Sequence, residues 1–411
     1  MKAERAGGRR CAIQGAGCAR RGRRGALRGR PGQGRARGGV RARAGGVCIV
    51  RAMLETSVKL ATVRSALAAN GLTAVRLRGS EWFAWITGGG SSVVLMTREA
   101  GVAEVLITAR DAWVLTDTIE AERLAAEEVP PELPVWSHPW ATPGRREEFV
   151  GRCCEGGWIA SDMPTGEERP LPPALQTARW ALSEPEVARY RALGAAAAKA
   201  MTEALAAARP EWTEHGLAGA GAEALWSRGI EPALILVGGE RRLPLYRHPT
   251  PTPEQLGGRA MLVFCARKHG LVASLTRHVY FRTPTREEQQ AMAAVARVEA
   301  DALEASRPGT PLSAVYAAIA SAYAREGYPH GEAGHHQGGP CGYAAREAIA
   351  RPGVSLPIVE GGAVAYNPSL PGVKIEDTAL VAGGQIEFLT VDPGWPKVHV
   401  RGLARPDVLL R

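Results

Sequence analysis

The first 52 residues differ so sharply from the rest of the chain that they decide where a fold can form. They contain 14 Arg, one Lys and one Glu, and they lack Phe, Tyr, Trp, Ser and Thr altogether. Such a segment cannot bury enough apolar surface to offset the conformational entropy lost on folding, so we expect residues 1–52 to be disordered. The folded part of the chain should therefore begin near Met53.

The function of this Arg-rich segment is open between two interpretations. It has neither the apolar run of a secretory signal nor the Ser-rich composition of a transit peptide. It could be an RNA-binding arm, although it lacks the aromatic side chains that stack on bases. We favour the alternative that residues 1–52 precede the true start of the protein, because GC-rich upstream DNA would encode Arg, Gly and Ala.

The remaining 359 residues hold 36 basic and 40 acidic side chains, so the overall charge of +10 belongs to the first segment. A mildly acidic body argues against nucleic-acid binding. No run of 18 uncharged apolar residues occurs, so we expect no contact with a membrane. The four cysteines of the body show no metal-binding or disulfide spacing, and we expect a cytoplasmic protein.

Alternating helical and strand patterns predict an α/β (α+β) protein of two domains, the first at 53–165. In this domain we expect helices at 57–69 and 115–128, and strands at 74–77, 85–87, 93–95 and 105–107. A proline-rich stretch separates it from a second domain at 175–411.

The second domain should open with a helix, because Ser183 is followed by Glu184, Pro185 and Glu186, which is typical of a helix start. Further helices are expected at 213–227, 285–305 and 312–325. Strands are expected at 233–237, 260–266, 271–281, 362–366, 373–381 and 385–391.

Three short motifs in the second domain resemble those of the pita-bread metallopeptidases, which include aminopeptidase P, prolidase and creatinase. They are 273–277 (ASLTR), 334–336 (GHH) and 373–381 (VKIEDTALV). The last is similar to the family's G-x-R-I-E-D-T-x-x-V strand, and Trp85-Ile86-Thr87-Gly88 is similar to its "YLTG"-like element. The resemblance implies a creatinase-type N-terminal domain followed by a pita-bread C-terminal domain.

The resemblance also implies a pair of divalent metals held by two Asp, one His and two Glu, which activate water for hydrolysis. In this sequence the five positions fall on Val263, Ser274, His335 or His336, Asn367 and Glu376. Three ligands are thus replaced, and no Asp or Glu occurs anywhere in 261–281. We therefore expect no cofactor, or at most one weakly bound divalent metal.

Resemblance to creatinase, which works without metal, implies that His248 is an acid/base. Together with His335, His336 and Glu376 it gives the candidate catalytic set, since imidazole can exchange protons near neutral pH. Candidate substrate-binding residues are Arg277, Tyr343, Arg346 and Glu347. Arg can hold a carboxylate through two hydrogen bonds. Each of these residues could equally have a structural or solvated role.

These residues leave three functions open. The first is a hydrolase of a peptide or amidine C–N bond, similar to aminopeptidase P or creatinase, with a degenerate and metal-free site. The second is a pita-bread protein that binds a peptide or small ligand without turnover. The third is an Xaa-Pro-type metallopeptidase. The expected partner is a small molecule or short peptide, and the resemblance implies a homodimer.

Overall fold

The computed structural model describes residues 42–154 and 156–411, so most of the Arg-rich segment, and the prediction of its disorder, lies outside the described residues. The first helix, α1 (Ala42–Asn70), includes the helix predicted at 57–69 and begins earlier. Among the helices that the structure describes, none has the length and apolar character needed to cross a bilayer.

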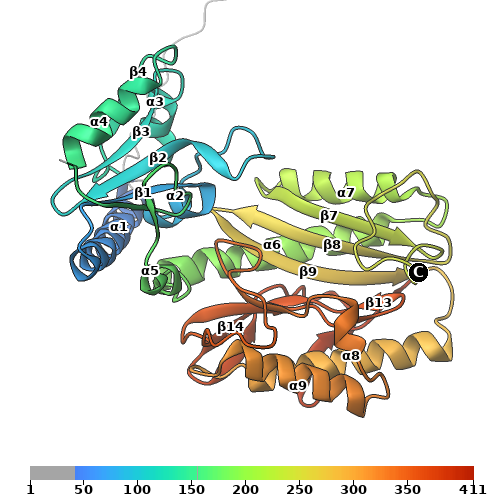
Figure 1. The fold of residues 1–411 in the computed structure, drawn as a ribbon. Coiled ribbons are helices and arrows are strands. Elements are labelled where there is room, and N and C mark those ends of the chain that lie inside the picture. The colour runs from blue at the N-terminus through green and yellow to red at the C-terminus, as the bar shows by residue number, and fades with distance from the viewer. Residues whose placement is uncertain (1–41, 155) are drawn as a thin grey trace, which may run out of the picture. The chain divides into compact units, whose positions relative to one another are not determined.

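The N-terminal domain is built on a six-stranded sheet with the order β4-β3-β2-β1-β5-β6 (Figure 1). β1 lies near its centre, antiparallel to β2 and parallel to β5. Apolar side chains of β1, β2 and α1 share one core cluster, which fixes the helix against the sheet. The elements are β1 (Ala74–Gly79), α2 (Ser80–Ile86), β2 (Ala100–Thr108), β3 (Ala112–Asp117), α3 (Ala121–Arg123), the π-helix η1 (Leu124–Glu128), β4 (Val135–His138), α4 (Gly144–Cys154), β5 (Ile159–Ser161) and β6 (Arg169–Pro170).

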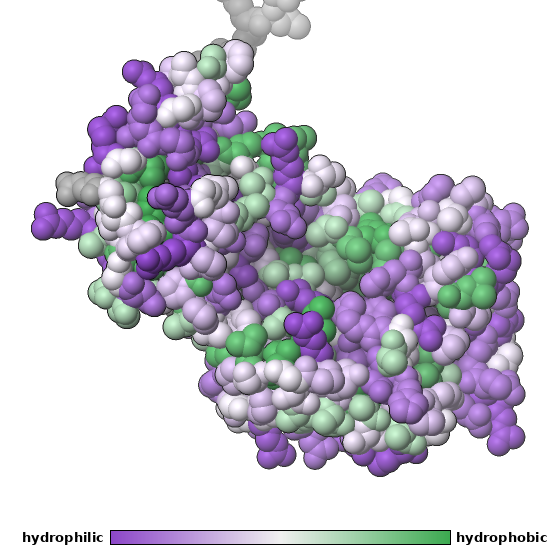
Figure 2. All heavy atoms as spheres, in the orientation of Figure 1, coloured by the Kyte–Doolittle hydropathy of each residue, from purple (hydrophilic) through white to green (hydrophobic). Residues whose placement is uncertain are grey.

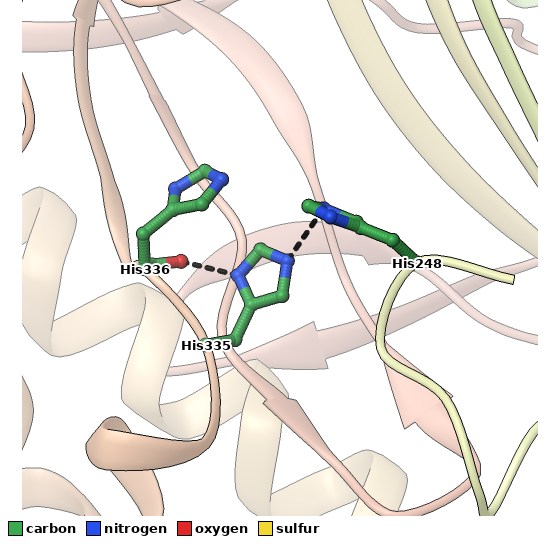
Figure 3. A group of neighbouring side chains, drawn as sticks. All are labelled: His248, His335 and His336. Atoms are coloured by element: carbon green, nitrogen blue, oxygen red, sulfur yellow. Dashed lines mark hydrogen bonds between the residues drawn. The ribbon is translucent and has the colours of Figure 1, made fainter.

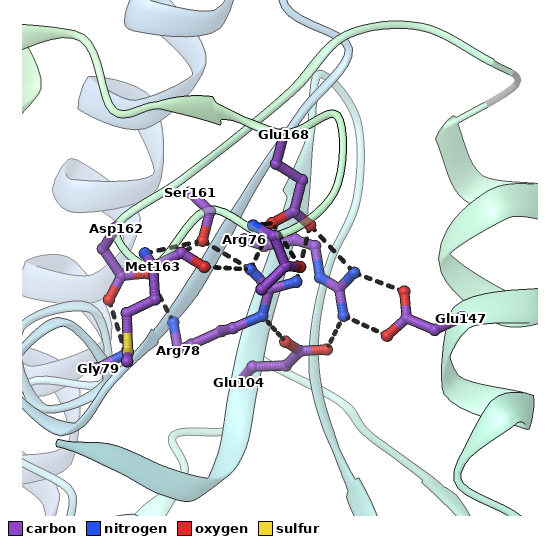
Figure 4. A network of polar contacts seen from close by, with 10 residues as sticks. Arg76, Arg78, Gly79, Glu104, Glu147, Ser161, Asp162, Met163 and Glu168 are labelled. Carbon is purple, nitrogen blue, oxygen red and sulfur yellow. Dashed lines mark hydrogen bonds and ion pairs between the residues drawn. The ribbon is translucent and has the colours of Figure 1, made fainter.

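A network of ion pairs stabilises this domain (Figure 4). Arg76 on β1 contacts Glu104 on β2 at 2.6 Å, Glu147 on α4 at 2.7 Å and Glu168 at 3.2 Å. Arg78, two residues further along β1, contacts Glu104 at 3.0 Å and Glu168 at 2.6 Å. The network therefore ties β1, its neighbouring strand and a distant helix together through opposite charges.

The C-terminal domain contains two four-stranded sheets, with the orders β18-β9-β8-β7 and β10-β11-β14-β15. Helices α6 and α7 pack on the first sheet, while α8 and α9 lie beside the second (Figure 1). The elements that follow β6 are α5 (Pro173–Ala178), α6 (Glu184–Ala207), α7 (Glu214–Trp226), β7 (Glu231–Gly239), β8 (Arg259–Lys268), β9 (Leu271–Tyr280), α8 (Arg286–Ala305), α9 (Leu312–Arg325), the 3-10 helix η2 (Gly331–Gly334), β10 (Gly338–Cys341), β11 (Gly362–Tyr366), β12 (Ser369–Leu370), β13 (Val373–Lys374), β14 (Asp377–Ala382), β15 (Gln385–Phe388), β16 (Lys397–Val400), β17 (Leu403–Pro406) and β18 (Leu409–Leu410).

The two sheets of this domain meet where the predicted strand at 373–381 is interrupted. β13 ends at Lys374 and β14 begins at Asp377. At the interruption the Thr276 N–H on β9 donates to the Glu376 carbonyl at 3.0 Å. Glu376 is thereby turned toward the first sheet, which places its carboxylate at the junction.

Side-chain caps begin three helices of the C-terminal domain. Ser183 and Glu186 form a capping box at the start of α6, and Thr285 and Glu288 form one at the start of α8. Thr213 caps α7 by accepting a hydrogen bond from the Gly216 N–H at 3.0 Å. The helices predicted to open after Ser183, at 213–227 and at 285–305 are confirmed.

Two predictions in the N-terminal domain are wrong, and a third is wrong at its start. Residues 85–87 were expected in a strand, but 85 and 86 end helix α2, and residues 93–95 lie outside any strand. The helix expected at 115–128 begins only at Ala121, because residues 115–117 belong to β3. In α2 the side chains are buried almost all round, so the apolar run has no period that separates helix from strand. Short apolar runs of this kind are resolved only by tertiary packing.

Hydrophilic side chains cover most of the face drawn in Figure 2, and apolar side chains appear there in separate small patches. Exposed large apolar residues, such as Trp140, Trp158 and Trp226, come from different parts of the chain. Single exposed apolar residues are ordinary on a folded protein, so this distribution by itself marks no binding surface.

Candidate functional site

Three histidines from two loops meet in the C-terminal domain (Figure 3). His248 lies in the loop between β7 and β8, whereas His335 and His336 lie between η2 and β10. Their possible ligand atoms all lie within 4.8 Å of one another. The structure thus brings together three of the four predicted catalytic residues, although His248 and His335 lie 87 positions apart in the sequence.

Hydrogen bonds fix how the imidazoles face each other. Nδ1 of His335 lies 2.5 Å from the carbonyl oxygen of His336, which can only accept, so this nitrogen carries the proton. In the neutral ring, Nε2 of His335 then keeps a lone pair, and it lies 2.8 Å from Nε2 of His248. The network assigns the donating N–H of this second contact to His248.

Gln337 holds the loop that carries the histidine pair. Its side chain is buried, and its amide nitrogen donates to the carbonyl oxygens of His335 at 2.6 Å and Glu332 at 3.1 Å. Its amide oxygen accepts from the Tyr323 hydroxyl at 3.2 Å. The histidine loop is therefore positioned by a buried polar contact rather than by its own exposed side chains.

The surroundings keep all three imidazoles uncharged. Burial, with Lys374 and the neighbouring histidines, lowers the pKa of His335 from 6.5 to about 3. Burial and Arg346 lower the pKa of His336 to about 4, and burial also lowers the pKa of His248. At neutral pH each ring is therefore neutral and offers a nitrogen lone pair.

An open cavity of about 740 Å³ adjoins the cluster, with His335, His336 and Arg346 in its wall. Other lining residues are Tyr316, Glu332, Gln337, Glu347 and Ile349. This volume is in the range of small-molecule sites, which are typically about 300–1,000 Å³. A small ligand inside it would have access to the imidazoles.

Glu376, the fourth predicted catalytic residue, occupies a different environment. Its buried carboxylate lies 2.5 Å from the Arg346 guanidinium and 2.8 Å from the Lys374 ammonium, and it accepts from the Thr276 hydroxyl at 2.9 Å. Burial alone would raise its pKa, but Lys374 and Arg346 outweigh burial and lower the pKa to about 2. The carboxylate is thus ionised, and both of its oxygens already have hydrogen-bond or ion-pair partners.

The four predicted substrate-binding residues do not form one group. Arg277 is buried and pairs with Asp377 at 2.7 Å. The Tyr343 hydroxyl donates to Glu186 at 2.6 Å, which connects the segment after β10 to α6. Arg346 and Glu347 both reach the cavity wall. Arg346 pairs there with Glu376, and Glu347 accepts from the buried Arg179.

The other ligand positions implied by the resemblance carry no acid. Val263 packs in an apolar cluster with Leu236, Leu243 and Met261. The Ser274 hydroxyl accepts from Arg346 at 3.3 Å and lies 3.6 Å from the Cys265 sulfur. The side-chain oxygen of Asn367 is buried without a hydrogen-bond partner among the described residues.

Sequence reasoning missed two residues that shape this region, Lys374 and Gln337. Lys374 stands two positions before Glu376, and alternate residues of an extended segment share one face, so this contact could have been expected. Gln337 follows the histidine pair directly, but a side chain that bonds its own loop leaves no signal in the sequence.

Comparisons with known proteins agree with this architecture. Residues 188–382 match metallopeptidase family M24, whereas a search among curated proteins found no match. A crystal structure of the dipeptidase PepE from Mycobacterium ulcerans is 18% identical with a TM-score of 0.70, covering 87% of this chain and 98% of that chain. The prolidase from Pyrococcus horikoshii OT3 is 19% identical with a TM-score of 0.69, covering 81% and 98%.

A further structure with the same fold is the N-terminal domain of the FACT complex subunit SPT16 from chickpea, Cicer arietinum. It is 12% identical, its TM-score is 0.63, and the match covers 84% of this chain and 96% of that chain. At such identities the structures show the fold alone. Residues 188–382 thus resemble metallopeptidase family M24, and the solved structures show that the chain has the pita-bread fold behind a creatinase-type N-terminal domain.

Proposed function

We propose that this protein hydrolyses a C–N bond of a short peptide or amidine at the cluster of His248, His335 and His336. The observation that carries the proposal is that three neutral imidazoles meet beside a cavity of about 740 Å³. The dipeptidase and prolidase that share the fold make short peptides the first substrates to test. A homodimer and a cytoplasmic location stay predictions.

We infer further that the family's pair of divalent metals does not fit the residues present. Two dications need several ionised carboxylates, because oxygen anions must balance their charge. Of the five implied positions, Val263 cannot coordinate, and Ser274 and Asn367 are neutral. Glu376 is the one acid, and it already pairs with Arg346 and Lys374. This donor set argues against the Xaa-Pro metallopeptidase alternative.

The chain's own residues would act on a bound substrate as follows. His248 and His336 are both exposed, so one of these neutral rings can accept a proton from an attacking water. His335, hydrogen-bonded to His248, orients that ring. Arg346 lies in the cavity wall and presents positive charge toward an anionic group of the substrate.

A second function, ligand binding without turnover, is favoured by the lowered pKa values. A ring whose pKa is about 3 or 4 is a weak base and is rarely protonated at neutral pH, so it is a poor general acid. The SPT16 domain, named as part of the FACT complex rather than as a peptidase, has the same fold. Fold alone therefore does not decide between catalysis and binding.

The test is a turnover assay with a panel of dipeptides, including Xaa-Pro, and small amidines, read by mass spectrometry. We expect turnover that falls about 100-fold or more in His248→Gln, the usual scale for loss of a general base. His399→Gln is the matched control, because His399 is an exposed residue of β16 outside the cluster.

Each other outcome points to one alternative. Saturable ligand binding without turnover would overturn the hydrolase proposal and leave a binding protein. Turnover of Xaa-Pro peptides that needs two bound metal ions and survives His248→Gln would instead indicate a conventional metallopeptidase.

A further inference from the structure

We propose that His248, His335 and His336 form a binding site for a single transition-metal ion of the zinc type, open on one side to the adjoining cavity. This site has three nitrogen ligands and no carboxylate, unlike the carboxylate-rich pair of metals that the family resemblance implies. It uses the same cluster as the proposed function but does not require that the protein turn over a substrate.

The spacing of the three rings suits one ion. Zinc binds imidazole nitrogen at about 2.0–2.1 Å with tetrahedral angles, which places neighbouring ligand nitrogens about 3.4 Å apart. The candidate atoms lie within 4.8 Å of one another, and the closest pair, Nε2 of His248 and Nε2 of His335, is separated by 2.8 Å. Binding therefore needs that pair to open slightly, which the exposed His248 side chain permits.

The contacts behind the rings are those that metal-binding histidines commonly have. A ligating imidazole usually donates its second N–H to a carbonyl or carboxylate, which fixes the ring and its tautomer. His335 does this, because its Nδ1–H donates to the His336 carbonyl and leaves Nε2 facing His248. Gln337 in turn holds the His335 carbonyl at 2.6 Å. His335 is thus oriented from behind, and its Nε2 faces His248 (Figure 3). Metal binding at Nε2 of His248 requires that ring to carry its proton on Nδ1 instead.

The neighbouring charges define which ion and which fourth ligand fit. The charged side chains near the cluster are Lys374, Arg346 and Glu376, and the Glu376 carboxylate is already paired with both cations. This positive surrounding disfavours hard ions such as Mn²⁺ and Mg²⁺, which need carboxylates, and leaves Zn²⁺, Co²⁺, Ni²⁺ and Cu²⁺, which accept imidazole. It also favours an anion, such as a carboxylate or hydroxide, in the open position.

An open fourth position is typical of catalytic rather than structural zinc sites. His335 and His336 line the cavity, so a ligand there can reach the ion. An ion held in this way would supply Lewis acidity toward a substrate carbonyl or a bound water.

The experiment uses the full chain, stripped with EDTA and dialysed, and then titrated separately with Zn²⁺, Co²⁺ and Mn²⁺. We expect about one equivalent of Zn²⁺ by elemental analysis, the stoichiometry of a three-histidine site. Co²⁺ should give the visible absorption of a tetrahedral nitrogen site, and Mn²⁺ should bind far more weakly. His248→Gln and His335→Gln should each lower the affinity for Zn²⁺ at least 10-fold, while His399→Gln, an exposed histidine of β16, should not.

Circular dichroism of each variant separates lost binding from lost folding, and the exposed or half-exposed positions make misfolding of both cluster variants unexpected. The proposal is overturned if stripped protein binds no Zn²⁺, or if it binds Zn²⁺ equally well after both substitutions. Zinc binding without hydrolysis would reject the proposed function and keep this site. Hydrolysis by a protein that binds no metal would reject this site and keep the proposed function.

Discussion

The ion-pair network around Arg76 and the cluster around His335 are both polar groups gathered from distant parts of the chain, but they differ in how far they satisfy one another. In the network, the Arg76 and Glu104 side chains are each 4% exposed, and each lies against opposite charge. In the cluster, three uncharged imidazoles lie against one another, and their one mutual hydrogen bond joins His248 to His335. The comparison separates a set of charges that neutralise one another and stabilise the fold from a set of uncharged rings for which we propose a ligand.

The largest expected effect comes from breaking the network. Among the described residues, Arg76→Met leaves Glu104 and Glu168 with Arg78 as their one cationic partner. Losing one member of a buried pair typically costs about 3–5 kcal/mol, because the remaining charge is desolvated without compensation. We expect a loss of this size in the free energy of unfolding, measured by urea denaturation.

Arg191→Met is the matched control for this prediction. Arg191 pairs with Glu387, and their side chains are 52% and 47% exposed. Because solvent screens an exposed pair, the loss should stay below about 1 kcal/mol. Equal losses in the two variants would show that burial does not distinguish these ion pairs.

An intermediate effect is expected at Glu376, which the sequence assigns to the catalytic set but whose contacts resemble those of the network. Glu376→Gln keeps an oxygen acceptor and removes the charge that balances Arg346 and Lys374. A hydrogen bond to a charged group contributes about 1.5–3 kcal/mol, so we expect a stability loss of about 2 kcal/mol in urea unfolding.

Glu254→Gln serves as its control, because Glu254 pairs with Arg241 at the surface. This variant should unfold as the parent does. If Glu376→Gln were as stable as the parent, the carboxylate would contribute nothing to the fold, and a role reserved for a ligand would become the better account.

The two regions also differ in what the sequence could predict. Capping boxes and hydrophobic periodicity predicted the helices of the C-terminal domain, because those signals are local. In the motif at 373–381, the identity of Glu376 was visible, but the interruption that turns it onto Thr276 depends on a second sheet. Local patterns therefore identified the residue without its environment.

For the histidines, the sequence indicated the residues but not that they contact one another. Their residue types and the family resemblance singled out His248, His335 and His336. Their mutual contacts depend on two loops brought together by tertiary packing, so no spacing in the sequence reports the 2.8 Å between two rings. Arg277 illustrates the same limit, since nothing in its strand shows that it pairs with the buried Asp377 rather than with a substrate.

The smallest expected effect on the free energy of unfolding comes from His335→Gln, and it distinguishes the cluster from the network by its dependence on pH. At neutral pH, His335→Gln should change the free energy of unfolding by less than about 0.5 kcal/mol, as for most positions outside a packed core. In the fold the pKa of His335 is lowered from 6.5 to about 3, so between these values the unfolded chain binds a proton that the native chain does not. Stability should therefore fall as pH drops below 6.5 and continue to fall toward pH 3. Urea unfolding at pH 7 and pH 5 should show a smaller loss in His335→Gln than in the parent, and an equal loss in both would mean that this ring is not held neutral by the fold.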